Sequence, residues 1–216
     1  MKKAVLIVLG LVLLLLGLVG ASAGVGAYMI FGSKGAYTSK VATGSSDGVA
    51  LYVSSFHVQQ GWLPKGLFDI SLSARATNAK TAFVGVAPIT NAQTYLAGAP
   101  YGAVAELNAG TMTVKPVPGS KSGVPAPEAQ TFWIEKGQGD PATIPWQAQE
   151  ATDVLMFMNA DGTPGVAVDI DATLSRDGLP TAMIVAVVVG AVLVVVGIVL
   201  IWAGVRSGRK RRTEAA

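Results

Sequence analysis

The chain has 216 residues, 51% of them hydrophobic, and its 16 Lys and Arg residues outnumber its 13 Asp and Glu residues. It contains no cysteine, which excludes a disulfide scaffold and thiolate metal sites, so a folded domain must be stabilised by a packed core. Its single histidine, His57, excludes a metal site built on a pair of histidines.

The amino-terminal segment carries Lys2 and Lys3 and continues as an uncharged apolar run over residues 4–31. A helix needs about 20 residues to cross the hydrocarbon core, so this run predicts a transmembrane helix behind a cytoplasmic segment, residues 1–3. The segment also resembles a signal peptide, because Ala21, Ser22 and Ala23 have the small side chains of a cleavage site. Apolar character that continues to Phe31 favours retention, while cleavage after Ala23 stays an open alternative.

Residues 32–180 consist of short alternating segments separated by Gly, Pro, Asn and Asp. This pattern predicts one mainly β domain, a β-sandwich or jelly-roll-like fold with one short helix at residues 88–96. Residues 153–172 carry an Asp-Gly turn signal and are predicted to form a hairpin. The predicted strands are residues 49–53, 67–76, 82–86, 111–117, 131–135, 153–158 and 166–172.

A second uncharged apolar run, residues 181–205, predicts a second transmembrane helix, and a basic tail of residues 206–216 follows it. Residues 33–39 and 175–181 are predicted to be short links between the helices and the β domain. Residues 115–130 are rich in Pro, Gly, Ser and Lys and are predicted to form a loop.

The distribution of charge predicts the orientation of the chain. The two short flanks hold seven of the 16 basic residues and one acidic residue, which leaves 12 acidic and nine basic residues between the apolar runs. Lys and Arg concentrate on the cytoplasmic side of membrane proteins, so both termini are expected in the cytoplasm and the central domain outside the plasma membrane. The cluster of basic residues that follows the second apolar run is a short juxtamembrane tail, which argues against a nucleic-acid-binding domain.

Glycines recur every seven residues in both apolar runs. A heptad spacing keeps small residues on one side of a helix, where they let two backbones approach closely in lipid. We therefore expect the two helices to pack against each other in antiparallel fashion, although a homo-oligomer interface would use the same residues. The glycines are Gly10, Gly17 and Gly24 in the first run and Gly190, Gly197 and Gly204 in the second.

Four aromatic residues form the candidate surface for a ligand or partner: Trp62, Phe132, Trp133 and Trp146. An aromatic platform could bind the sugar rings of an envelope glycan. The alternative is that these side chains fill the core of the β domain or lie near the membrane interface.

The polar residues offer weaker candidates for chemistry. Catalysis through His57 would need a nucleophile that no motif in the sequence marks, so we expect no catalytic residue there. Asp161, Asp169 and Asp171, with Asp140 and Glu150, could offer oxygen ligands to calcium. Their spacing does not match an EF-hand loop, and we expect no cofactor.

A family likeness is carried by five segments. They are residues 83–88 (FVGVAP), 95–98 (YLAG), Phe132 with Trp133, Trp146, and residues 158–162 (MNADG). Together they resemble a group of two-pass membrane proteins of actinobacterial type with an exported β-sandwich-like domain. The resemblance implies the architecture and an envelope location, and it assigns no active site.

These features predict a membrane-anchored, non-enzymatic envelope protein. Its exported domain would bind a membrane protein, a second copy or an envelope component such as a glycan. The alternative is a hydrolase or transferase that acts on envelope glycan or lipid, with Asp140, Glu150 and Asp153 as candidate acid and base. Carboxylates that converge beside Trp133 or Trp146 would favour that alternative.

Overall fold

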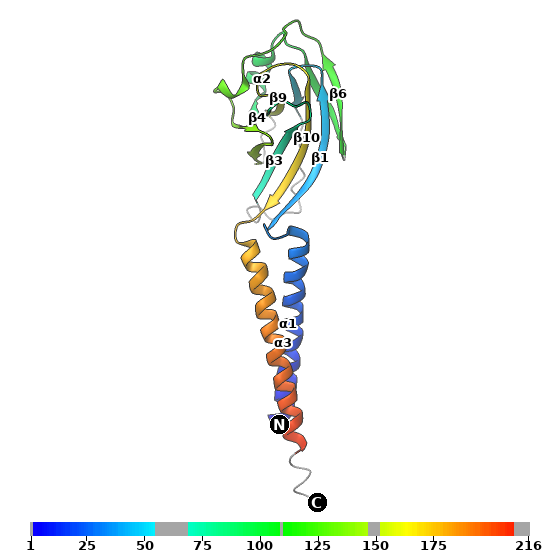
Figure 1. Cartoon of the computed structure of the whole chain (residues 1–216), viewed down its shortest axis with the longest axis vertical. Coiled ribbons are helices and arrows are strands. Elements are labelled where there is room, and N and C mark those ends of the chain that lie inside the picture. The colour runs from blue at the N-terminus through cyan, green and yellow to red at the C-terminus, as the bar shows by residue number, and fades with distance from the viewer. Residues whose placement is uncertain (1, 55–68, 109, 147–151, 210–216) are drawn as a thin grey trace, which may run out of the picture. The chain divides into compact units, whose positions relative to one another are not determined.

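The computed structural model describes residues 2–54, 69–108, 110–146 and 152–209, which form two compact units. One unit contains Met1–Tyr37 with Arg176–Ala216, and the other contains Thr38–Ser175. Each unit is described by itself below (Figure 1).

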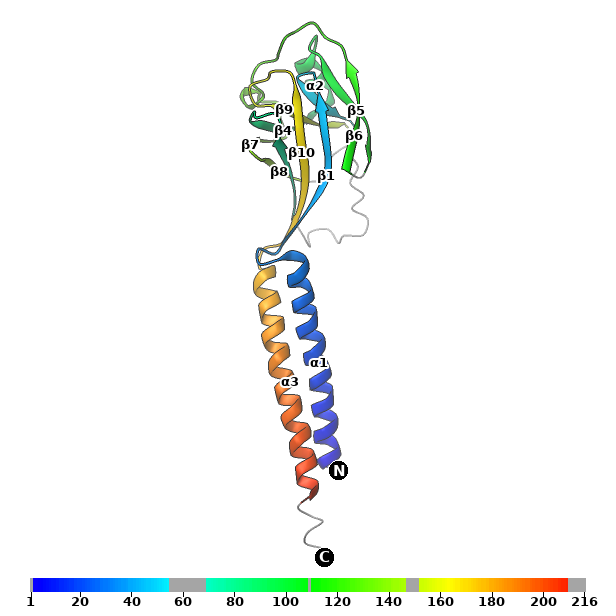
Figure 2. The same ribbon diagram turned by 45° about the vertical axis from the view of Figure 1, so that its right-hand side comes forward.

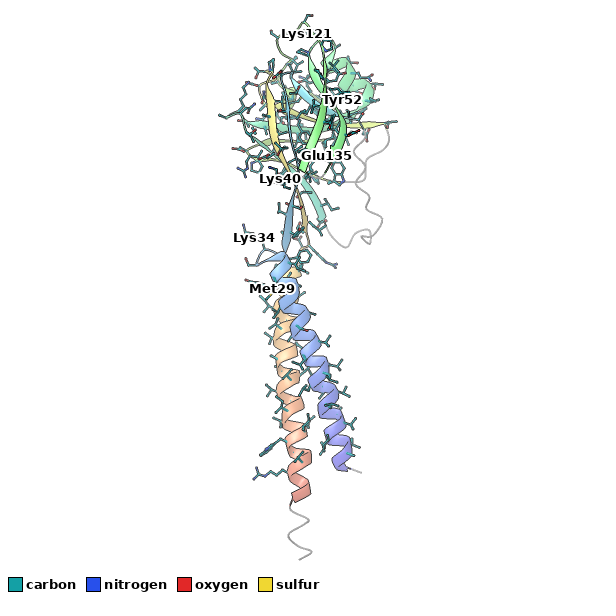
Figure 3. All side chains as sticks on the ribbon, turned by 90° about the vertical axis from the view of Figure 1, so that its right-hand side faces the viewer. Met29, Lys34, Lys40, Tyr52, Lys121 and Glu135 are labelled. Atoms are coloured by element: carbon teal, nitrogen blue, oxygen red, sulfur yellow. The ribbon has the colours of Figure 1, made fainter. Side chains whose placement is uncertain are left out.

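The first unit is a pair of long helices, α1 (Lys2–Phe31) and α3 (Leu179–Arg209). Each contains a stretch of 28 residues that is long and apolar enough to cross a membrane. Most of their large apolar side chains project outward, as the stick view shows for Met29, which is 79% exposed (Figure 3). The second helix begins two residues before the predicted run, and Pro180 occupies its first turn, where a missing N–H costs no hydrogen bond.

The heptad glycines lie between these two antiparallel helices (Figure 2). A Cβ atom at Gly10 would lie 2.7 Å from the carbonyl oxygen of Gly197, and one at Gly17 would lie 2.6 Å from that of Gly190. The reverse substitutions at Gly190 and Gly197 would meet the carbonyl oxygens of Gly17 and Gly10 just as closely. The two backbones are therefore in direct contact at both levels, which no other residue type would permit.

The register continues beyond these two glycine pairs. Gly24 lies against Met183 and Val187. Met183 is buried and lies seven residues before Gly190, so it occupies the heptad position at which the next glycine of α3 would fall. Gly204 is also buried at the opposite end of the seam. Successive levels are seven residues apart, about 10 Å along a helix, so the four levels from Met183 to Gly204 span about 31 Å, close to the thickness of the hydrocarbon core.

The second unit contains one ten-stranded sheet in the order β7-β4-β9-β2-β5-β6-β1-β10-β3-β8. It forms a nearly closed barrel, because the two outermost strands, β7 and β8, follow each other in the chain and contact each other. The pairs β1–β6 and β2–β5 are parallel. The strands are β1 (Ala36–Ser46), β2 (Ala50–Val53), β3 (Asp69–Ala76), β4 (Ala82–Pro88), β5 (Tyr101–Asn108), β6 (Gly110–Val117), β7 (Glu135–Gly139), β8 (Ala142–Pro145), β9 (Asp153–Asn159) and β10 (Val166–Ser175).

The barrel interior is apolar. Alternate residues of the strands point inward, so Leu51, Leu72, Val84, Phe157 and Ile170 meet in one buried cluster. On the outside, neighbouring strands exchange polar contacts: the Asp169 carboxylate of β10 accepts a hydrogen bond from Thr43 Oγ1 at 2.7 Å and pairs with Lys40 Nζ at 2.9 Å. Figure 3 labels Lys40 on β1.

The expected sandwich is not confirmed, since the strands belong to one continuous sheet that curls on itself. The predicted hairpin at residues 153–172 is wrong, because β9 pairs with β2 and β4 while β10 lies between β1 and β3. The Asp-Gly turn is present, but the buried Asn159 amide binds the carbonyl oxygens of Thr163 and Pro164 and turns the chain toward a different part of the barrel.

The other predicted elements are mostly confirmed, including the short helix, which is α2 (Ile89–Leu96). The strand predicted at residues 131–135 is wrong: β7 begins only at Glu135, because Phe132 and Trp133 cover the outside of the barrel. The strands β1, β5 and β8 were not predicted. Their small and polar residues, such as those of residues 42–46, resemble a loop until the neighbouring strands are in place.

The glycine packing between the two helices can be tested by comparing substitutions at two positions of α1, Gly17 and Gly26. Gly17→Ala would place a methyl group 2.6 Å from the Gly190 carbonyl, whereas Gly26→Ala would meet nothing within 4 Å. We expect Gly17→Ala to destabilise the helix pair by about 1–3 kcal/mol, the usual cost of overpacking. Thermal unfolding of the full-length protein in micelles measures this difference, and equal melting temperatures for the two variants would contradict the packing.

Candidate functional site

A second apolar cluster lies on the outer face of β4, β9 and β2. In β4, Val84 points into the barrel while Phe83 points outward, and in β9 the same alternation places Met156 and Met158 outward. Both faces of these strands are buried, which explains their continuous apolar sequence. The helix α2 lies over β4 and β9 and covers part of this outer face with Ala92 and Leu96 (Figure 1).

Phe83 on this face packs with three rings that cover it, and together the four form what we call the aromatic cluster: Phe83, Tyr95, Phe132 and Trp133. Trp133 packs over Gly85, where a Cβ atom would lie 2.6 Å from the indole, and its ring centroid is 5.0 Å from that of Phe83. Phe132 packs on Trp133 at 4.7 Å, and Tyr95 packs on Phe132 at 5.4 Å. The cluster thus extends outward from a fully buried ring on β4 to three half-buried rings.

Two hydrogen bonds to the main chain fix these rings. The Trp133 indole Nε1–H donates to the carbonyl oxygen of Pro127 at 2.8 Å, and the Tyr95 hydroxyl donates to that of Pro125 at 2.6 Å. Burial raises the pKa of the Tyr95 phenol well above its ordinary value, so the hydroxyl stays a neutral donor at physiological pH. The short 3₁₀ helix Pro127–Ala129 is thereby held against the aromatic cluster.

A surface groove of about 350 Å³ lies between α2 and the segment that follows the 3₁₀ helix. We call it the α2 groove. None of the described residues that line it is charged: two are aromatic, two carry amides and two carry hydroxyls. They are Thr90, Asn91, Thr94, Tyr95, Gln130 and Phe132. Glu128, two residues before Gln130, forms an ion pair with Lys136 Nζ at 3.3 Å, so its negative charge is balanced by its partner.

The structure separates the four aromatic residues that the sequence singled out. Phe132 and Trp133 lie together in the aromatic cluster, but Trp146 is 7% exposed and belongs to the barrel interior, so it offers no surface. Trp62 lies outside the described residues. Sequence reasoning missed Tyr95 as a site residue, although the helix predicted at residues 88–96 contained it.

Asp140 and Asp153, the two candidate catalytic carboxylates that the structure describes, do not converge. Asp140 follows Gly139, which pairs with Ala82 at the start of β4, whereas Asp153 pairs with Pro88 at its end. Six residues of extended strand span about 20 Å, well beyond the roughly 5–10 Å between the two carboxyl groups of a glycosidase. Asp140 also lies 3.7 Å from Arg75 Nη1, and Glu150 and His57 lie outside the described residues.

The remaining aspartates have structural roles. Hydrogen bonding by Thr163 lowers the pKa of the Asp161 carboxyl, which stabilises the turn after β9. Hydrogen bonds from Thr43 and then Lys40 lower the pKa of Asp169. Within the described part of the chain, no three His, Cys, Asp or Glu side chains lie close enough together to hold a metal ion.

Comparisons with known proteins do not assign the chain to a family. No protein-family model matches it, and no curated protein is significantly similar to it. Among solved structures, it aligns with the D1-D2-D3 domains of the flagellar cap protein FliD from Escherichia coli at 9% identity over 96% of this chain and 75% of that one. The TM-score of that alignment is 0.22, which supports no argument about fold or function.

The close contact between Trp133 and Gly85 yields a second prediction. Gly85→Ala would place a methyl group in contact with the Trp133 ring, so we expect the β domain to lose about 1–3 kcal/mol of unfolding free energy. Trp133→Phe shortens the ring at that contact, and the double variant should therefore lose less than the sum of the two single losses. Chemical denaturation of the full-length protein measures all three, and strict additivity would contradict the contact.

Proposed function

We propose that this chain is a two-pass membrane protein with both termini in the cytoplasm, and that its β domain is a non-enzymatic binding module outside the plasma membrane. The two apolar helices support the membrane location, and the Lys and Arg residues that flank them support the orientation. The module binds a protein partner or an envelope component.

The observation that carries this proposal is the construction of the α2 groove. Its aromatic wall is fixed in advance by ring packing and by the two hydrogen bonds to Pro125 and Pro127, a property of binding sites that keep their shape without ligand. Its polar groups are amides and hydroxyls that can bind but are poor acids and bases at neutral pH. Among the described residues, no carboxylate pair accompanies the groove, which supports binding over hydrolysis.

Photo-crosslinking in intact cells tests the binding proposal. Benzoylphenylalanine replaces Gln93, an exposed residue of α2 that does not line the groove, in the full-length protein. The control carries the same probe at Gln138, an exposed residue of β7. We expect an adduct at position 93 that is absent at position 138. Equal labelling at both positions, or none, would refute a binding role for this surface.

The absence of native cysteine makes the orientation directly testable, because any introduced thiol is unique. We expect Ser122→Cys, an exposed position in the β domain, to react with a membrane-impermeant maleimide on intact cells. Thr213→Cys in the basic tail should react only after the cells are opened. The reverse pattern would invert the proposed topology, and loss of an amino-terminal tag from the mature protein would show cleavage of the first segment instead.

A further inference from the structure

We propose that the α2 groove binds an uncharged sugar unit of an envelope glycan. The inference rests on the proposed binding function and names the class of ligand. It starts from the fact that the six lining residues which the structure describes are uncharged and that two of them, Tyr95 and Phe132, present half-buried rings.

The two rings match one property of a sugar. A pyranose ring has faces made of C–H groups with a slight positive charge, and the face of an aromatic ring carries a slight negative charge. Phe132 and Tyr95 are inclined to each other by 57°, so they line the groove with an angled aromatic surface and not with one flat platform. A sugar ring can pack on one aromatic face while its edge meets the other.

The amides match a second property. Asn91 uses its Oδ1 to accept a hydrogen bond from Thr90 at 3.5 Å, and Gln130 uses its Nε2 to donate one to the carbonyl oxygen of Ala126 at 3.2 Å. Within the described part of the chain, Asn91 Nδ2 and Gln130 Oε1 make no hydrogen bond, so the groove keeps a free amide NH2 group as donor and a free carbonyl oxygen as acceptor. A sugar hydroxyl both donates and accepts, and can therefore use both amides.

Charge and size restrict the ligand further. Among the described residues, no cation lines the groove to balance a phosphate, sulfate or carboxylate, and Lys136, the nearest base along the chain, is already paired with Glu128. A volume of about 350 Å³ is near the lower limit of small-molecule sites, which run from roughly 300 to 1,000 Å³. A protein partner would need a far larger surface, roughly 800 Å² on each side. The groove thus suits a short neutral stretch of glycan.

Saturation-transfer NMR on the full-length protein tests this assignment. The protein is held in lauryldimethylamine oxide micelles, because a maltoside detergent would present sugar headgroups to the groove. The probes are chitotriose, maltotriose and mannotriose, with a sulfated disaccharide as the charged comparison. We expect saturation transfer to the ring C–H protons of at least one neutral trisaccharide and none to the sulfated sugar.

The variants locate the site without disturbing the core. Asn91→Ala and Gln130→Ala each remove one surface amide, and each should weaken binding about two- to tenfold, the effect of one hydrogen bond. Gln138→Ala removes an exposed amide on β7 and should leave binding unchanged. Thermal unfolding checks that all three variants remain folded.

Three outcomes would overturn the inference: no transfer to any neutral sugar, equal transfer to the sulfated sugar, or undiminished binding in the Asn91→Ala, Gln130→Ala double variant. The photo-crosslinking experiment separates this failure from failure of the proposed function. A protein adduct at position 93 without sugar binding would retain the binding module and reject the glycan. The absence of both would reject both.

Discussion

Burial of both faces of β4 and β9 is the constraint on which the rest of the β domain depends. The inner face closes the barrel around its apolar core, but Phe83, Met156 and Met158 on the outer face would be exposed to water without a cover. The chain has no cysteine, so no disulfide can stabilise the domain in place of buried apolar surface. Two separate segments cover the outer face: α2 and the residues around Trp133. The α2 groove is the junction between these two segments. The candidate site is therefore a consequence of how the outer face of the barrel is covered.

The helical unit solves a different problem with different chemistry. In lipid there is little hydrophobic gain from bringing two apolar helices together, so close packing has to supply the attraction. Gly10 with Gly197 and Gly17 with Gly190 provide it by removing side chains between the two backbones. Met183 ends the run of glycines opposite Gly24, and at this level Gly24 packs against the Met183 carbonyl oxygen and the Val187 side chain. The remaining surface of both helices is apolar, as a lipid-facing surface would be.

Polar residues in the β domain are used mainly to fix the main chain. Asn159 binds the turn after β9, Asp161 binds its own turn through Thr163, and Asp169 joins β10 to β1. Tyr95 and Trp133 likewise direct their polar atoms to carbonyl oxygens near the 3₁₀ helix. The amides of Asn91 and Gln130 retain unused capacity at the groove, and this contrast supports a binding role there.

The sequence by itself determined the two helices, the heptad of glycines, the β class of the central domain and most of its strands, because periodicity and uninterrupted apolar length depend only on local residue order. It also singled out Phe132 and Trp133, together with Trp62 and Trp146, as candidates for a binding surface. Only the tertiary structure decided that the sheet closes into a barrel, that β9 and β10 do not pair, that Trp146 is interior, and that Tyr95 joins Phe132. These facts depend on which distant strands become neighbours. Strand pairing is set by the burial of whole faces and not by any local signal in the chain.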